Sequence, residues 1–185
     1  MRKNYSLWLP VFLALILPGA MTTPALADVT DVSPGGFTVR LEIDIEASPI
    51  DVYEAAVGRI AEWWSSDHTF SGDAANMTIE HRLGGCFCET FGEDGGVVHM
   101  QVTFLNRGRM IRLTGGLGPL GLMGVSGNMT WEFGEADAGT RWVLTYAVGG
   151  YSRDGLDKIA GPVDQTLEEQ MQRLKALLES GATGQ

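Results

Sequence analysis

The sequence predicts an α+β domain in which an antiparallel sheet packs against one long helix near the C-terminus. The helix is indicated by residues 162–179, where apolar side chains recur every three or four positions and form one stripe. The stripe consists of Val163, Leu167, Met171, Leu174 and Leu178. The sheet is indicated by the preceding part of the chain, where short strand-like segments alternate with turn residues. Because short turns join neighbouring strands, we expect antiparallel pairing.

The clearest strand is residues 37–46, in which apolar and polar side chains alternate strictly. The sequence Ser-Pro-Ile-Asp at 48–51 then supplies an N-cap, a proline at the first helical position and an acidic residue three positions after the cap. The helix that begins there is expected to run to about Trp64, with Trp63 and Trp64 on its buried side.

The middle of the chain is expected to consist of a polar loop at 65–75 followed by two hairpins and two further strands. The predicted strands are 77–81, 86–91, 97–105, 110–114, 128–134 and 140–148. Residues 115–127 contain six glycines and one proline. This segment has two interpretations: a long hairpin connection, or a flap over a cavity, since glycine makes several backbone shapes accessible. Gly161-Pro162 is expected to interrupt the preceding segment, so that the long helix begins after this break.

Residues 1–27 have the pattern of a secretory signal peptide: Arg2 and Lys3, an apolar run at 7–17, and a small-residue cleavage site ending at Ala27. The apolar run is shorter than the roughly 20 residues that span a bilayer. We therefore predict cleavage after Ala27, an exported protein that is periplasmic or secreted, no stable membrane insertion after cleavage, and a single domain at 28–185. An uncleaved anchor is the alternative.

The chain is acidic. It has 13 basic and 23 acidic residues, and loss of the two basic residues of the signal changes the net charge from −10 to 11 − 23 = −12. A negative surface disfavours nucleic acid and anionic membranes as partners, because both are themselves negative. The charge contains no information about the fold.

The two cysteines, Cys86 and Cys88, are expected on the same face of one strand. If the following turn centres on Asp94, Cys88 opposes Met100 and both sulfurs enter the core. The alternative register, shifted by one residue, pairs Cys88 with His99. The first register fits the apolar parity of the partner strand and predicts two reduced, buried thiols facing the long helix near Met171 or Leu174; it also sets Glu89 beside His99 on the other face.

A metal site and a redox role are the alternatives for the cysteines. A metal site would combine Cys86 and Cys88 with a histidine, His99 first, but the spacing is not the usual zinc pattern and no second cysteine pair exists. We therefore predict no metal and no cofactor. His68 and His99 are the candidates for acid–base catalysis, His68 because Asp67 and Asp73 are close in sequence.

A sheet wrapped on a single helix leaves a pocket between the two, and an apolar pocket needs aromatic walls with a few polar groups to orient a ligand. Arg112 and Tyr146 could supply the polar groups if their side chains point inward. The candidate ligand-binding residues are Trp63, Trp64, Met100, Arg112, Trp131, Tyr146, Met171 and Leu174. The expected partner is a small apolar molecule; the oligomeric state stays open.

The order strand, helix, several strands, helix resembles the helix-grip fold of the START-like (SRPBCC) superfamily over residues 37–179. Trp63-Trp64, the Gly-Gly-Cys-Phe of 84–87, the Gly-Thr-Arg of 139–141 and the closing amphipathic helix are similar to one branch. That branch is named after the activator of the ninety-kilodalton heat-shock chaperone's ATPase. The export signal is a departure from the mostly cytoplasmic members of the family.

The resemblance implies a curved antiparallel sheet of about six to seven strands around the C-terminal helix, with a hydrophobic cavity between them. Members bind lipids, hormones or polyketides, and some are cyclases or dehydratases. The expected function is therefore an exported domain that holds a small hydrophobic or amphipathic ligand. The alternatives are a cavity enzyme, a cyclase, dehydratase or hydrolase with a histidine acid–base, and a thiol/histidine metal site.

Overall fold

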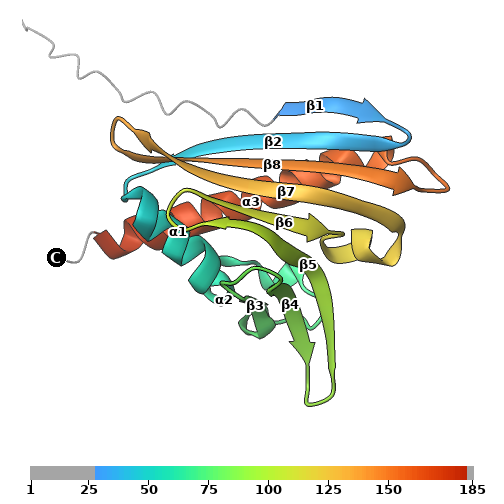
Figure 1. The fold of residues 1–185 in the computed structure, drawn as a ribbon, viewed down its shortest axis with the longest axis horizontal. Coiled ribbons are helices and arrows are strands. Elements are labelled where there is room, and N and C mark those ends of the chain that lie inside the picture. The colour runs from blue at the N-terminus through green and yellow to red at the C-terminus, as the bar shows by residue number, and fades with distance from the viewer. Residues whose placement is uncertain (1–27, 183–185) are drawn as a thin grey trace, which may run out of the picture.

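The computed structural model describes residues 28–182, where an open, curved antiparallel sheet of eight strands lies against one long helix (Figure 1). The strands are β1 (Asp28–Ser33), β2 (Gly36–Ile45), β3 (Met77–Ile79), β4 (Cys86–Phe91), β5 (Gly95–Asn106), β6 (Met110–Gly115), β7 (Gly124–Ala136) and β8 (Gly139–Tyr151). Their order across the sheet is β1-β2-β8-β7-β6-β5-β4-β3. This is the helix-grip arrangement, with β1 as a strand that the sequence pattern did not indicate.

The predicted signal peptide, residues 1–27, lies outside the described residues. Within residues 28–182, no helix is long and apolar enough to cross a membrane.

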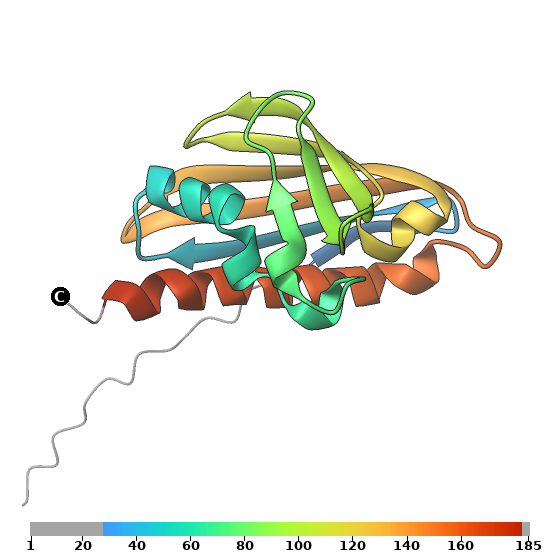
Figure 2. The same cartoon turned by 90° about the horizontal axis from the view of Figure 1, so that it is seen from below.

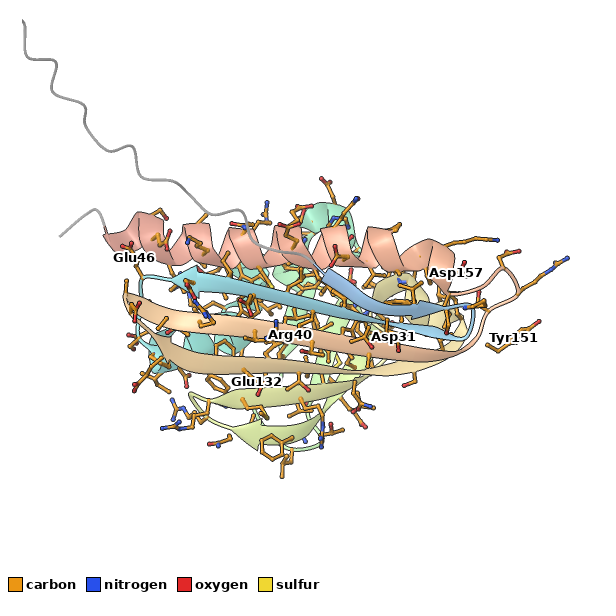
Figure 3. All side chains as sticks on the ribbon, turned by 90° about the horizontal axis from the view of Figure 1, so that it is seen from above. Asp31, Arg40, Glu46, Glu132, Tyr151 and Asp157 are labelled. Carbon is orange, nitrogen blue, oxygen red and sulfur yellow. A yellow bond between two sulfur atoms is a disulfide. The ribbon has the colours of Figure 1, made fainter. Side chains whose placement is uncertain are left out.

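The long helix α3 (Asp157–Ala182) runs along one face of the sheet (Figure 2). It begins at Asp157, close to the β8 end at Tyr151, and extends to the opposite end, near Glu46 (Figure 3). The central residues of the predicted stripe, Leu167, Met171 and Leu174, are fully buried. The inward residues of β2 face them, so the stripe and the sheet bury each other.

The predicted break before this helix is wrong, because α3 continues through Gly161 and Pro162. Proline's fixed φ is compatible with a helix, and the hydrogen bond that it removes is one turn and a half from the helix start. Packing of Leu156 and Ala160 against the core holds the first turn in place, since both are buried.

The first helix forms where predicted, as α1 (Pro49–Gly58) followed by the short α2 (Ile60–Trp63). Ser48 caps α1, because its hydroxyl oxygen accepts a hydrogen bond from the amide of Asp51 at 3.4 Å. The helix breaks at Arg59, whose φ of −123° is not helical. Trp63 and Trp64 are buried, as the pattern predicted.

The first register considered from the sequence is wrong, and the alternative holds only at Cys86 and Phe87, which pair with Gln101 and Met100. Phe87 pairs with Met100 and Cys88 pairs with Val98, so the ladder shifts by one residue between the two pairs. His99 is the extra residue on β5, which makes this a β-bulge. As a result His99 and Met100 are both buried, although they are adjacent in sequence.

The bulge reverses the predicted assignment of faces on β4. Phe87 and Glu89 point into the molecule and are 0 % and 1 % exposed, whereas Cys86 and Cys88 lie on the other face and are half-buried. The cysteines therefore do not face α3. A one-residue difference in register moves every side chain of a strand to the opposite face.

The prediction of two reduced thiols is also wrong, since Cys86 and Cys88 form a disulfide. Their Cα atoms are 5.4 Å apart, which a disulfide spans. In a fully extended strand the same two positions would be about 7 Å apart. The chain next to the bulge is thus less extended than a regular strand, and this makes the bond possible.

The disulfide predicts a specific labelling result. In the unfolded but unreduced protein, neither cysteine should react with iodoacetamide, because both sulfurs are bonded. After reduction, mass spectrometry should detect two alkylated residues. Alkylation of the unfolded protein without prior reduction would contradict the bond.

Candidate functional site: a cavity between the sheet and α3

A cavity of about 340 Å³ lies between the inner face of the sheet and the N-terminal half of α3. Its wall is mainly apolar, with a few polar side chains. The lining residues are Trp64, Asp67, His68, Thr69, Phe70, Met77, His99, Leu117, Gly118, Pro119, Leu120, Met123, Tyr146, Ile159, Pro162, Val163, Thr166 and Leu167.

Four parts of the chain build this wall: α3, the loop after α2, the central strands, and the glycine-rich segment 115–127. That segment joins β6 to β7, as the first interpretation states, and contains a 3₁₀ helix, η3 (Gly118–Leu122). Residues 117–120 line the cavity, as the flap interpretation requires. Leu120 is buried, so it anchors the segment against the rest of the wall.

His99 is a buried polar side chain of the wall, with 3 % of its side chain exposed. Its Nε2 lies 3.2 Å from a carboxylate oxygen of Glu89. Its Nδ1 accepts a hydrogen bond from the amide of Gly118 at 3.3 Å. Nε2 faces an acceptor and must carry a proton, whereas Nδ1 faces a donor and must carry a lone pair. These partners assign the neutral tautomer with the proton on Nε2. Phe70 stacks on the ring, with centroids 5.7 Å apart.

Glu89 has a buried carboxylate with three hydrogen-bond partners. It accepts from the amide of Phe70 at 3.0 Å, from the amide of Ser71, and from Nε2 of His99. Glu89 therefore ties the loop after α2 to β4 and orients the His99 ring. A buried charge without such partners would be strongly destabilising.

The pKa values of the pair shift in the same direction for different reasons. Burial raises the pKa of Glu89, but the hydrogen bonds from Ser71, Phe70 and His99 outweigh it, and the net pKa lies below its ordinary value. Burial lowers the pKa of His99 more than the Glu89 carboxylate raises it. At neutral pH the site therefore contains a carboxylate and a neutral imidazole.

Tyr146 adds a second polar contact to the glycine-rich segment. Its hydroxyl donates to the carbonyl of Gly115 at 3.2 Å and accepts from the amide of Leu117 at 3.1 Å. Burial raises the pKa of Tyr146 to about 12, so the hydroxyl stays protonated. Tyr146 and His99 together hold the backbone of residues 115–118 across the cavity.

His68 also lines the cavity, but at its edge, with one third of its side chain exposed. Its Nε2 lies 3.2 Å from Glu169 of α3. The expected pairing with Asp67 or Asp73 does not occur, because Asp73 instead accepts from the amide of Ala75 and caps η2 (Ala74–Asn76).

Of the predicted ligand-binding residues, Trp64 and Tyr146 line the cavity. Five others are buried in the core and do not line it: Trp63, Met100, Trp131, Met171 and Leu174. Trp63 and Trp131 belong to an aromatic cluster with Trp142, in which ring centroids are 5.6–6.1 Å apart. Hydrophobic periodicity identifies buried positions, and it does not distinguish a cavity wall from filled core.

Arg112 is a correction, because its side chain is exposed on the outer face of β6, 5.7 Å from the ring of Phe104. Its neighbours Ile111 and Leu113 take the inner face and are fully buried. Alternation along the strand therefore excludes Arg112 from the cavity.

The metal-site alternative is also wrong. Cys86 and Cys88 are bonded to each other, on the face opposite to His99. In the described part of the chain, no three His, Cys, Asp or Glu side chains lie close enough together to hold a metal ion.

Removal of the Glu89 carboxylate should destabilise the fold strongly. In Glu89→Ala the donors of Phe70, Ser71 and His99 lose their acceptor, and we expect a loss of about 2–4 kcal/mol in the free energy of unfolding. Glu132→Ala is the matched control, since Glu132 is exposed on the outer face of β7 (Figure 3) and should cost no more than about 0.5 kcal/mol. Urea unfolding at pH 7 measures both; equal effects would contradict the role of Glu89.

The same variant should change the pH dependence. A group whose pKa is lower in the folded than in the unfolded state stabilises the fold. Its contribution to the free energy of unfolding is fully present above the unfolded-state pKa and is lost as the pH falls through the folded-state pKa. For Glu89 the loss begins below the ordinary value of 4.5, and for His99 below 6.5. The stability difference between wild type and Glu89→Ala should therefore shrink once the pH falls below about 4.5.

No protein-family model matches the chain, and no curated protein matches it. Several solved structures are similar. An uncharacterised protein from Rhizobium leguminosarum has a TM-score of 0.59 and 18% identity over 85% of this chain and 99% of its own. CalU16 from Micromonospora echinospora has a TM-score of 0.56 and 13% identity, covering 84% of each chain.

A third similar structure is DynU16, described as a protein of the dynemicin biosynthetic locus. It has a TM-score of 0.53 and 17% identity, covering 78% of this chain and 48% of its own. At these identities the comparisons show a shared fold alone. This agrees with the helix-grip topology of the chain.

Proposed function

We propose that the protein binds a small, largely apolar molecule in the cavity between the sheet and α3. The observation that supports this most directly is the cavity itself. Its volume of about 340 Å³ is within the roughly 300–1,000 Å³ range of small-molecule sites. An apolar wall with a few polar groups is the usual composition of such sites.

The polar groups support an amphipathic ligand over a pure hydrocarbon. His99 and Tyr146 lie deep in the wall, whereas Asp67 and His68 lie in the loop that borders it. A ligand with one hydrogen-bonding group could exchange that group for the backbone contacts that His99 and Tyr146 now make. The description of DynU16 as a biosynthetic-locus protein also supports a small molecule as the class of ligand.

We also propose that the chain belongs to the branch named after the chaperone-ATPase activator. The Gly-Thr-Arg motif supports this, because its first residue occupies a backbone position that favours glycine. Gly139 has φ +140°, and a Cβ there would approach the carbonyl oxygen of Ile45. Thr140 donates to the carbonyl of Ala47 at 2.7 Å. These contacts explain the motif through the fold, and they do not require a chaperone partner.

We further propose export with cleavage after Ala27. The disulfide supports this independently of the signal pattern, because such bonds persist in oxidising compartments and are rare in the cytosol. N-terminal sequencing of the protein recovered from a bacterial periplasm should begin at Asp28. Ala25→Leu with Ala27→Leu should block the cleavage site and leave a longer, membrane-associated product. A wild-type product that retains residues 1–27 would contradict the proposal.

Filling the cavity should weaken binding. Thr166 of α3 lines the cavity, whereas Gln165 beside it is exposed. With the uncharged fluorescent probe N-phenyl-1-naphthylamine, wild type should bind, Gln165→Trp should bind equally, and Thr166→Trp should bind at least about tenfold more weakly, which is 1.4 kcal/mol. Circular dichroism checks that both variants fold. Absence of wild-type binding, or equal binding by both variants, would contradict the proposed site.

A further inference from the structure

We propose that Glu89 and His99 form an acid–base pair, in which Nδ1 of His99 removes a proton from a molecule bound in the cavity. This inference rests on the proposed function, because it needs a ligand in the cavity. It adds a reaction class, proton transfer, to a binding site.

The first support is the direction of the two ring nitrogens. Nε2 points toward the carboxylate of Glu89, and Nδ1 points toward the amide of Gly118, a residue that lines the cavity. The lone pair of the neutral ring is therefore on the cavity side, where it accepts the hydrogen bond from the Gly118 amide. A base must have its lone pair within hydrogen-bond reach of the proton that it removes.

The second support is the protonation state. His99 is buried and neutral at pH 7, so its Nδ1 is available as a base. The carboxylate of Glu89 is ionised and fully enclosed behind the ring. After proton transfer it would face an imidazolium at hydrogen-bond distance and stabilise that charge. This is the role of the carboxylate in a Ser-His-Asp triad.

The third support is that the ring cannot turn easily. Phe70 stacks on it at 5.7 Å and Phe87 packs edge-on at 5.6 Å between centroids. Glu89 also fixes the loop that carries Phe70, through the amides of residues 70 and 71. The tautomer and the orientation are therefore held by the same carboxylate, which makes Glu89 a positioning residue.

The fourth support is that the present partner of Nδ1 is replaceable. The bond from the amide of Gly118 is 3.3 Å long, and Gly118 lies in the glycine-rich segment with φ +57°. A ligand that brings a proton to Nδ1 would take the place of this amide. The released amide of Gly118 would then be a backbone donor at the cavity wall, where it could donate a hydrogen bond to a developing negative oxygen.

The substrate class that fits is an apolar molecule with a weakly acidic C–H or O–H. In the step itself, the C–H or O–H bond breaks, its electron pair stays on the substrate, and the proton forms an N–H bond at Nδ1. The product leaves after a double bond has formed or a leaving group has taken the electrons. The proton then returns to the product or to water, and no oxidant or reductant is needed.

The probe for this step is 5-nitrobenzisoxazole, an uncharged molecule that opens to a cyanophenolate when a base removes its C–H proton. The electrons of the C–H bond form the nitrile, and the N–O bond breaks. We expect wild type to accelerate this opening over buffer and His99→Gln to lower the rate about 100-fold, within the range of general-base contributions. His81→Gln is the matched control, since His81 is bonded to Tyr53 and is not part of the cavity wall.

The pH profile tests the role of Glu89. The other titratable groups that line the cavity are Asp67 and His68 from the loop and Tyr146 from β8; the lining residues of α3 and of segment 115–127 have none. The wild-type rate should fall as the pH drops through a pKa below 6.5. In Glu89→Gln the profile should move to lower pH, because the carboxylate raises the pKa of His99. A purely structural role would lower the rate without moving the profile.

Binding of N-phenyl-1-naphthylamine separates the two proposals. Wild type and His99→Gln should both bind it, and it should inhibit ring opening competitively. Three results would each overturn the acid–base pair and leave the binding function standing. Wild type could bind N-phenyl-1-naphthylamine without accelerating ring opening, His99→Gln could retain the acceleration, or N-phenyl-1-naphthylamine could fail to inhibit it. Failure of wild type to bind the probe would overturn both.

A second measurement does not depend on any variant folding. Long-range ¹H–¹⁵N NMR spectra of wild type at pH 7 should show His99 as the neutral tautomer protonated at Nε2. A ring protonated at Nδ1, alone or together with Nε2, would overturn the inference.

Discussion

The rest of the structure depends on the mutual burial of the α3 stripe and the inner face of the sheet. Neither surface is stable in water alone, because each exposes a continuous apolar face. Leu167, Met171 and Leu174 are the fully buried residues of the stripe, and Leu167 also lines the cavity. At the N-terminal half of α3, part of the space between the helix and the sheet is left open as the cavity. The same packing thus explains both the core and the site.

The filled part of the interior is made of large aromatic residues. Trp63 of α2 packs edge to face with Trp131 of β7 and Trp142 of β8. The indole N–H groups of Trp131 and Trp142 have no hydrogen-bond acceptor, which fits edge-to-face rings whose positive edges meet aromatic faces. None of these three residues lines the cavity.

The bulge at His99 connects the fold to the site. It turns two consecutive side chains inward, so that Met100 fills the core and His99 reaches the cavity. Glu89 on the partner strand then becomes a buried charge that needs donors. The loop after α2 supplies two of them, and His99 supplies the third. One irregularity in a strand therefore orders a loop, a ring and a carboxylate together.

The sequence by itself determined the elements whose signals are local. Strand β2, the Ser48 cap and the α3 stripe were all correct, because alternation, capping and helical spacing depend on neighbours along the chain. Their order also indicated the helix-grip fold. His68 and His99 were identified as candidates. The pairing of Glu89 with His99, which distinguishes His99, was also expected, but on the outer face of the sheet and not on the inner one.

Only the tertiary structure decided the register of β4 on β5, and with it the faces of Cys86, Cys88 and Glu89. Register depends on how two strands pair. A single bulge shifts it by one residue, exchanges the faces on which the side chains lie, and has no clear signal in the sequence of either strand. The disulfide and the inward carboxylate follow from that choice. The cavity wall was likewise undetermined, because Thr166, Leu117 and Gly118 have no periodic signal and meet only when α3 and the glycine-rich segment pack together.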